Sequence, residues 1–148
     1  MATRDDVVTE ALTWEGTPFH HHARLKGVGV DCAMFLAEVY HAVAPSLVPR
    51  IAPAHYPVSW HLHHDEELFV GWVRRYTDEF DGPPLAGDIV LFKTGRAYGH
   101  GAISIDWPDG VHAASADGAV VTRADLTQGW LAGLSRRYFS IGRLLGEV

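Results

Sequence analysis

The sequence has a single cysteine, no long apolar run and no excess of basic residues, and each scarcity restricts what the protein can be. With only Cys32 present, no internal disulfide can form, so an oxidising compartment is neither required nor excluded. The apolar runs are short and interrupted, which predicts no segment inserted in a membrane. The net charge of −6 disfavours nucleic acid as a partner, because phosphate binding requires clustered Lys and Arg.

The beginning of the chain, MATRDDVVTE, lacks the basic-then-apolar order of a secretory signal peptide. We therefore expect a protein made in the cytoplasm. Its length of 148 residues and hydrophobic content of 47% predict a single domain, residues 1–148, that buries a substantial core.

The spacing of apolar residues predicts helices first and strands afterwards. Helices are expected over about residues 5–14, from residue 32 to just before Pro45, and over about residues 65–76. Strands are expected at residues 89–92, 99–106, 110–115, 118–123 and 136–145. This order predicts an α+β fold in which the sheet is antiparallel.

Cys32 lies where a glycine-rich loop meets the second expected helix, in the stretch KGVGVDCAMFLAEVY. If Asp31 is the N-cap, the thiol sits at the positive end of the helix, which can lower its pKa and yield a thiolate at neutral pH. Neighbouring backbone N–H groups could also stabilise an oxyanion beside the sulfur. The alternative is a buried cysteine that completes the apolar stripe of the helix.

A catalytic cysteine needs a base, and two histidines in the sheet half are candidates. His100 stands between two glycines on an expected strand, and period-two alternation puts it on one face with Ala102 and Ser104. We expect this face of small residues to pack against the helix N-terminus that carries the thiol. His112 begins the next strand, where it could hold the His100 ring in the tautomer that a base requires.

Five short motifs, in this order along residues 5–145, resemble the NlpC-type cysteine peptidases, which are papain-like cell-wall endopeptidases. They are GTPF (16–19), GVDCAMFLAEVY (29–40), LAGDIVLF (85–92), HGAISI (100–105) and VHAA (111–114). The resemblance implies a papain-like NlpC-type fold, with N-terminal helices packed on a roughly five-stranded antiparallel sheet. The insert HYPVSWHLHHDEELF (55–69) resembles the branch encoded with phage tail proteins.

The resemblance implies a thiol hydrolase that cleaves peptide bonds in peptidoglycan stem peptides, commonly between γ-D-glutamate and a diamino acid. Cys32 would be the nucleophile, His100 the general base and His112 the residue that orients it. Asp31 would meet a substrate ammonium, unless it is only a helix cap. No metal or organic cofactor is implied. Tail proteins would be partners, and the enzyme would reach the wall on a virion tail or by release at lysis.

The sequence also departs from the family pattern beside the nucleophile. Ala33 and Met34 replace the usual Ser-Gly, and Phe19 replaces a tyrosine. In the family these positions receive the substrate and shape the pocket. The sequence therefore does not identify which peptide bond is cleaved.

The chain has ten histidines, several of them in HHH (20–22) and HLHH (61–64). His61, His63, His64 and Asp65 could ligate zinc, although their spacing does not suit one helix face. The alternative is a loop at the rim of the cleft, where Tyr56 and Trp60 offer aromatic surface to a substrate. Three hypotheses therefore stand: a peptidoglycan hydrolase, a structural tail component with the same fold and little or no activity, and a histidine-rich metal-binding module.

Overall fold

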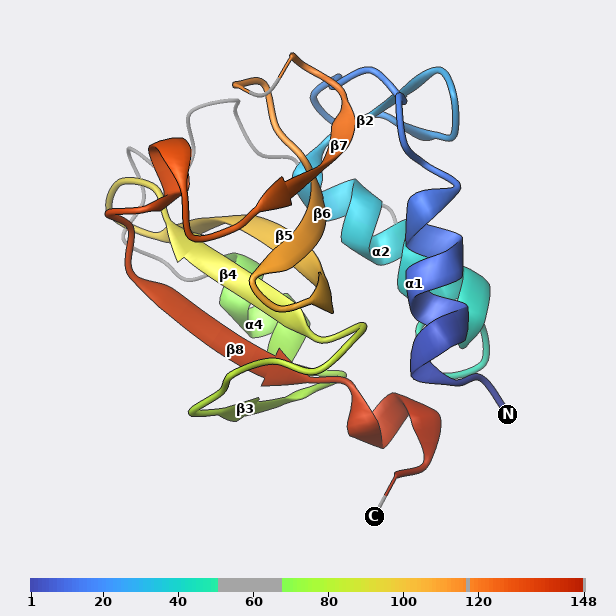
Figure 1. Ribbon diagram of the computed structural model, residues 1–148. Helices are drawn as coiled ribbons and strands as arrows, with labels where there is room; N and C mark the ends of the chain where they lie inside the picture. Colours follow the sequence, from blue (N-terminus) through green and yellow to red (C-terminus); the bar gives the residue numbers. More distant parts are fainter. Residues whose placement is uncertain (51–67, 117, 148) are drawn as a thin grey trace.

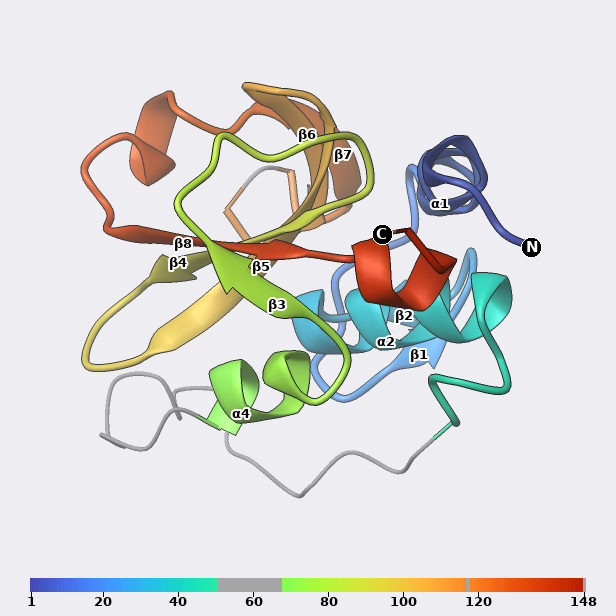
Figure 2. The ribbon, with the colours of Figure 1, turned by 90° about the horizontal axis from the view of Figure 1, so that it is seen from below.

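The computed structural model describes residues 1–50, 68–116 and 118–147, and it has an α+β architecture (Figure 1). Helices α1 (Arg4–Leu12), α2 (Cys32–Val43) and α4 (Leu68–Arg74) pack on one face of a six-stranded antiparallel sheet, as Figure 2 shows from below. The strand order is β3-β8-β4-β5-β6-β7. The strands are β3 (Asp78–Phe80), β4 (Ile89–Lys93), β5 (Tyr98–Asp106), β6 (Asp109–Ala113), β7 (Val121–Asp125) and β8 (Arg136–Ser140).

The predicted α+β class is confirmed, and all five expected strands are present with shifted ends. A sixth strand, β3, was not predicted because it has only three residues and no apolar alternation. It is held by pairing with β8 and by ion pairs from Glu79 to Arg74 and Arg137. The last expected strand stops at Ser140, and the 3₁₀ helix η2 (Gly142–Leu145) follows it. Residues 65–67 of the third expected helix lie outside the described residues.

A two-stranded hairpin that was not predicted precedes α2. It consists of β1 (Arg24–Leu25) and β2 (Gly29–Val30). Gly27, in its turn, has a φ of +79°, a conformation that favours glycine. The hairpin brings Val30, which is fully buried, directly to the start of α2.

The sheet separates two hydrophobic clusters. The larger lies between the helices and one face of the sheet, and includes Phe35, Leu36 and Ile103. The smaller lies on the opposite face and consists of Val90, Phe92, Ala102, Leu126 and Leu131. Strand β4 is buried on both faces, which explains why IVLF is a continuous apolar run.

Helix α2 approaches β5 closely at Gly101. A Cβ atom there would lie 2.8 Å from Leu36 Cδ1 and 3.0 Å from Phe69 Cζ, so a larger residue would separate helix and strand. The expectation that the small residues on the face of His100 pack against the N-terminus of α2 is therefore wrong for Ala102, which belongs to the cluster on the other side of the sheet. Glycine at position 101, one residue after His100, is what permits the approach.

Candidate active site

Helix α2 begins at Cys32, as predicted, and Asp31 is its N-cap. The Asp31 backbone is extended, with φ −103° and ψ 177°, and its Oδ1 accepts a hydrogen bond of 2.8 Å from the Met34 N–H. Aspartate is among the preferred N-cap residues because its side chain satisfies a backbone donor that has no partner within the helix. The sequence DC therefore fixes the thiol in the first turn.

The Cys32 thiol is partly exposed and lies at the junction of α2 and β5. Its Sγ–H donates to the Gly99 carbonyl at 3.6 Å. Loss of water and the neighbouring Asp31 carboxylate raise the pKa of Cys32 to about 12, although the backbone N–H groups of Gly101, Ala33 and Cys32 itself oppose this rise. The expectation of a lowered pKa is therefore wrong for this conformation, because desolvation and a like charge outweigh the helix N-terminus. The resting thiol is protonated at neutral pH.

His100 and His112 form a buried pair on β5 and β6. His100 Nε2 and His112 Nδ1 are 2.8 Å apart and share one hydrogen bond, and the ring centroids are 5.0 Å apart. His100 is 6% exposed and His112 is fully buried. The two histidines that the sequence places on consecutive strands are thus in direct contact.

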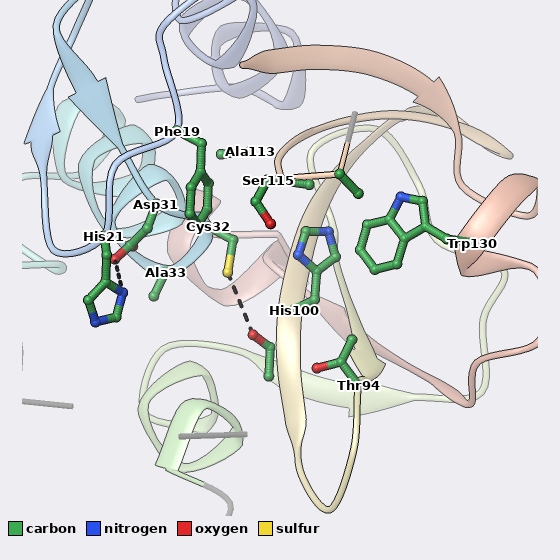
Figure 3. A pocket seen from close by; sticks show the side chains of 13 residues that line it. Phe19, His21, Asp31, Cys32, Ala33, Thr94, His100, Ala113, Ser115 and Trp130 are labelled. Carbon is green, nitrogen blue, oxygen red and sulfur yellow. Dashed lines mark hydrogen bonds and ion pairs between the residues drawn. The ribbon is translucent and has the colours of Figure 1, made fainter. Parts of the chain in front are cut away.

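Cys32 and His100 line the same pocket, which has a volume of about 270 Å³ (Figure 3). Phe19 and Ala33 line it as well, together with Asp31. The remaining lining residues are His21, Thr94, Gly99, Ala113, Ala114, Ser115, Ala116 and Trp130. The pocket therefore brings together every expected site residue that the structure describes, except His112, which lies behind His100. Tyr56 and Trp60 lie outside the described residues.

Sequence reasoning missed Trp130, which is 40% exposed and lines the pocket from the 3₁₀ helix η1 (Gly129–Leu131). Figure 3 shows the imidazole of His100 between the Cys32 thiol and this indole. The available signal was a tryptophan in the turn-like stretch TQGWLAG, between the strands expected at residues 118–123 and 136–145. Nothing in that stretch indicates which earlier strand the indole reaches.

The HHH motif is divided between two environments. His20 is exposed, whereas His21 lines the pocket and its Nδ1 lies 3.8 Å from Asp31 Oδ2. That same oxygen accepts a hydrogen bond of 2.7 Å from the His22 N–H. Asp31 therefore organises the loop as well as the helix.

Within residues 1–50, 68–116 and 118–147, no cluster of three His, Cys, Asp or Glu side chains could hold a metal ion. His61, His63, His64 and Asp65, the candidate zinc ligands, lie outside these ranges. No helix among the described residues is long and apolar enough to cross a membrane.

We expect Asp31→Asn to accelerate alkylation of Cys32 by iodoacetamide. Asparagine keeps an oxygen that can cap α2 but removes the negative charge that raises the thiol pKa, so more thiolate is present at any pH below about 12. A rate increase of roughly threefold to tenfold at pH 8 corresponds to the loss of one nearby like charge. Asp109→Asn, at an exposed position outside the pocket, is the matched control. An unchanged or lower rate in Asp31→Asn would contradict the electrostatic explanation.

Comparison with solved structures places this geometry in a known fold. The sequence matches no protein-family model and no curated protein. The NlpC/p60 domain of the peptidoglycan hydrolase SagA is 19% identical, with a TM-score of 0.62 over 92% of this chain and 97% of that domain.

Two longer proteins share the same architecture. An NlpC/p60 family protein from Bacillus cereus ATCC 10987 is 17% identical, with a TM-score of 0.61 over 92% of this chain and 39% of that one. NlpC2 from Trichomonas vaginalis is 17% identical, with a TM-score of 0.60 over 95% of this chain and 48% of that one. The chain thus spans less than half the length of these two proteins. We conclude that it has the fold of NlpC/p60 domains.

Proposed function

We propose that the protein is a cysteine peptidase that cleaves peptide bonds in bacterial peptidoglycan stem peptides, with Cys32, His100 and His112 as its catalytic groups. The observation that carries the proposal is the placement of the only thiol and a hydrogen-bonded histidine pair around one pocket. The likeness to the NlpC/p60 domain of a peptidoglycan hydrolase supports the substrate class.

The reaction starts from a protonated thiol, because the pKa of Cys32 is about 12. As the sulfur attacks the scissile carbonyl carbon, its proton passes to His100. The protonated imidazole then gives this proton to the leaving amine, and a thioester to Cys32 is left. His100 next removes a proton from water, the hydroxide attacks the thioester, and the proton returns to the sulfur as the acid product leaves.

The pocket fits a short, slender peptide segment. Its volume of about 270 Å³ is small, and the side chains of Ala33, Ala113 and Ala114 narrow it without adding polar groups. Asp31 offers a negative charge to a substrate ammonium. We propose that the bond cleaved is the one between γ-D-glutamate and a diamino acid.

We propose that the protein reaches the cell wall on a phage tail. This proposal rests on the resemblance of the insert at residues 55–69 to proteins encoded with phage tails.

The test is incubation of wild type and Cys32→Ala with defined muropeptides, with mass spectrometry of the products. We expect new stem-peptide fragments with wild type and none with Cys32→Ala, because alanine has no nucleophile. If both proteins are folded and neither cleaves, the hydrolase proposal fails for these substrates and a structural role in a tail gains support. A stoichiometric zinc content in the purified protein would instead support the metal-binding hypothesis.

A further inference from the structure

One aromatic side chain covers both members of the histidine pair. The Trp130 ring centroid lies 5.1 Å from that of His100, with an interplanar angle of 59°. It lies 6.2 Å from that of His112, with the rings nearly parallel at 14°. Leu131, the next residue, is 1% exposed in the smaller core cluster and anchors the turn that carries the indole.

The position of the Trp130 indole excludes water from the histidine pair and restricts the orientation of the His100 ring. The ring of Phe92 lies 5.9 Å from His100, so His100 is packed between aromatic neighbours. Such enclosure strengthens the hydrogen bond between His100 and His112, because water does not compete for it. A rotation of the His100 ring would also require Trp130 or Phe92 to move.

The same contact discriminates between the two protonation states of His100. A cation within about 6 Å of an indole centroid is attracted by the π electrons, and tryptophan provides the strongest such attraction of the aromatic residues. A neutral imidazole gains only the ordinary aromatic contact. The indole therefore stabilises imidazolium more than imidazole.

The other titratable groups of the pocket also influence this proton transfer. Those that line it are His21, Asp31 and Cys32, with His112 behind His100. Asp31 lies beside Cys32 and raises the pKa of the thiol, so it opposes loss of the sulfur proton. A group that favours the proton on His100 would offset this effect.

We propose that Trp130 is a positioning residue, which holds His100 against His112 and stabilises the imidazolium that forms when Cys32 gives up its proton. In this step the S–H bond of Cys32 breaks, an N–H bond on His100 forms, and no oxidant or further reactant takes part. The inference rests on the proposed function in one respect, the assignment of His100 as the base.

The test is a double-mutant cycle read by alkylation of Cys32 with iodoacetamide at pH 7. Because the chain has one cysteine, the rate reports this site alone. The four proteins are wild type, Trp130→Ala, His100→Ala and the double variant. Trp130→Ala is expected to react between about threefold and thirtyfold more slowly than wild type, the range for loss of a cation–π contact. In the His100→Ala background the same substitution is expected to have no effect, because Trp130 acts through His100.

A merely structural role gives the opposite pattern, with the same slowing in both backgrounds. That result, or an unchanged rate in Trp130→Ala, would overturn the inference. Trp130→Phe keeps an aromatic ring and is expected to remain within about threefold of wild type. Trp130→Leu takes the place of the alanine variant if the latter does not fold.

Trp107→Ala is the matched control, since the Trp107 ring contacts Tyr138 and Arg136, which do not line the pocket.

The alkylation cycle needs no peptide substrate. If the cycle shows coupling while no muropeptide is cleaved, the inference stands and the proposed function fails. If muropeptides are cleaved but the cycle is additive, only the inference fails.

Discussion

Replacement of His100 by alanine is expected to slow stem-peptide cleavage by about 10²- to 10⁴-fold, the range for loss of a general base. The effect should be large because the Cys32 thiol has a pKa of about 12 and cannot supply much thiolate by itself at neutral pH. Initial cleavage rates of a defined muropeptide, followed by liquid chromatography from pH 6 to 10, provide the measurement. Without His100, the residual rate should rise with pH, since hydroxide then has to remove the sulfur proton.

The hydrogen bond to His112 determines how His100 can work. For His100 to take a proton on Nδ1, its Nε2 must already carry hydrogen and donate to His112 Nδ1 at 2.8 Å. His112→Ala removes that acceptor, and the expected loss is about tenfold to a hundredfold, which corresponds to one hydrogen bond to a charged group. His112→Asn, which offers an oxygen acceptor, should lose less.

His41→Ala is a control for the loss of an imidazole. In the wild type, His41 Nδ1 is hydrogen-bonded to the Val48 carbonyl, and His41 does not line the pocket. If His100→Ala retains wild-type activity, another group is the base. If His112→Ala does so, the histidine pair has no part in orienting His100.

Asp88→Ala is expected to have the largest effect on stability, a decrease of about 3 kcal/mol in the free energy of unfolding. Asp88 is 1% exposed, and its Oδ1 lies 2.8 Å from Arg4 Nη1 and accepts from the Ile141 N–H at 3.0 Å. Its Oδ2 accepts from the Leu85 N–H at 2.8 Å. Alanine would leave all three donors without this acceptor and remove one of the two counter-charges of Arg4. Urea unfolding followed by circular dichroism provides the measurement.

Glu147→Gln is the control for this effect, because Glu147 binds the same Arg4 guanidinium from an exposed position. Exposed ion pairs contribute about 0–1 kcal/mol, so this substitution should change stability little. If the two substitutions lowered the free energy of unfolding equally, burial would not increase the contribution of Asp88 to stability. In the sequence, Asp88 appears only as part of the motif LAGDIVLF; the structure shows that it ties the start of β4 to α1 and to the end of β8.

Local chemistry explains why parts of the fold were predictable. The capping box of Thr3 and Asp6 at the start of α1 and the N-cap of Asp31 depend on contacts between residues close in sequence, and the expected N-cap of Asp31 is confirmed. The long strands β4 and β5 were recognised because their apolar pattern extends over several residues. Strands β1, β2 and β3 have two or three residues each, and only their partners define them.

The protonation state of Cys32 shows why local chemistry was insufficient at the site. The helix N-terminus is a local feature, and its N–H groups do lower the pKa of the thiol. Desolvation depends on how closely β5 approaches α2, and the absence of a side chain at Gly101 permits that approach. The balance between these effects reverses the direction expected from the sequence.

The sequence by itself determined the α+β class, the start of α2 at Cys32 and the identity of the candidate nucleophile and base, because these follow from apolar periodicity, capping and short motifs. Only the tertiary structure decided that Trp130 covers the histidine pair and that the thiol is protonated at rest. Both depend on atoms from segments far apart in the chain. The contacts between η1, β5 and β6, and the loss of water around the sulfur, exist only after the sheet and helices have packed together.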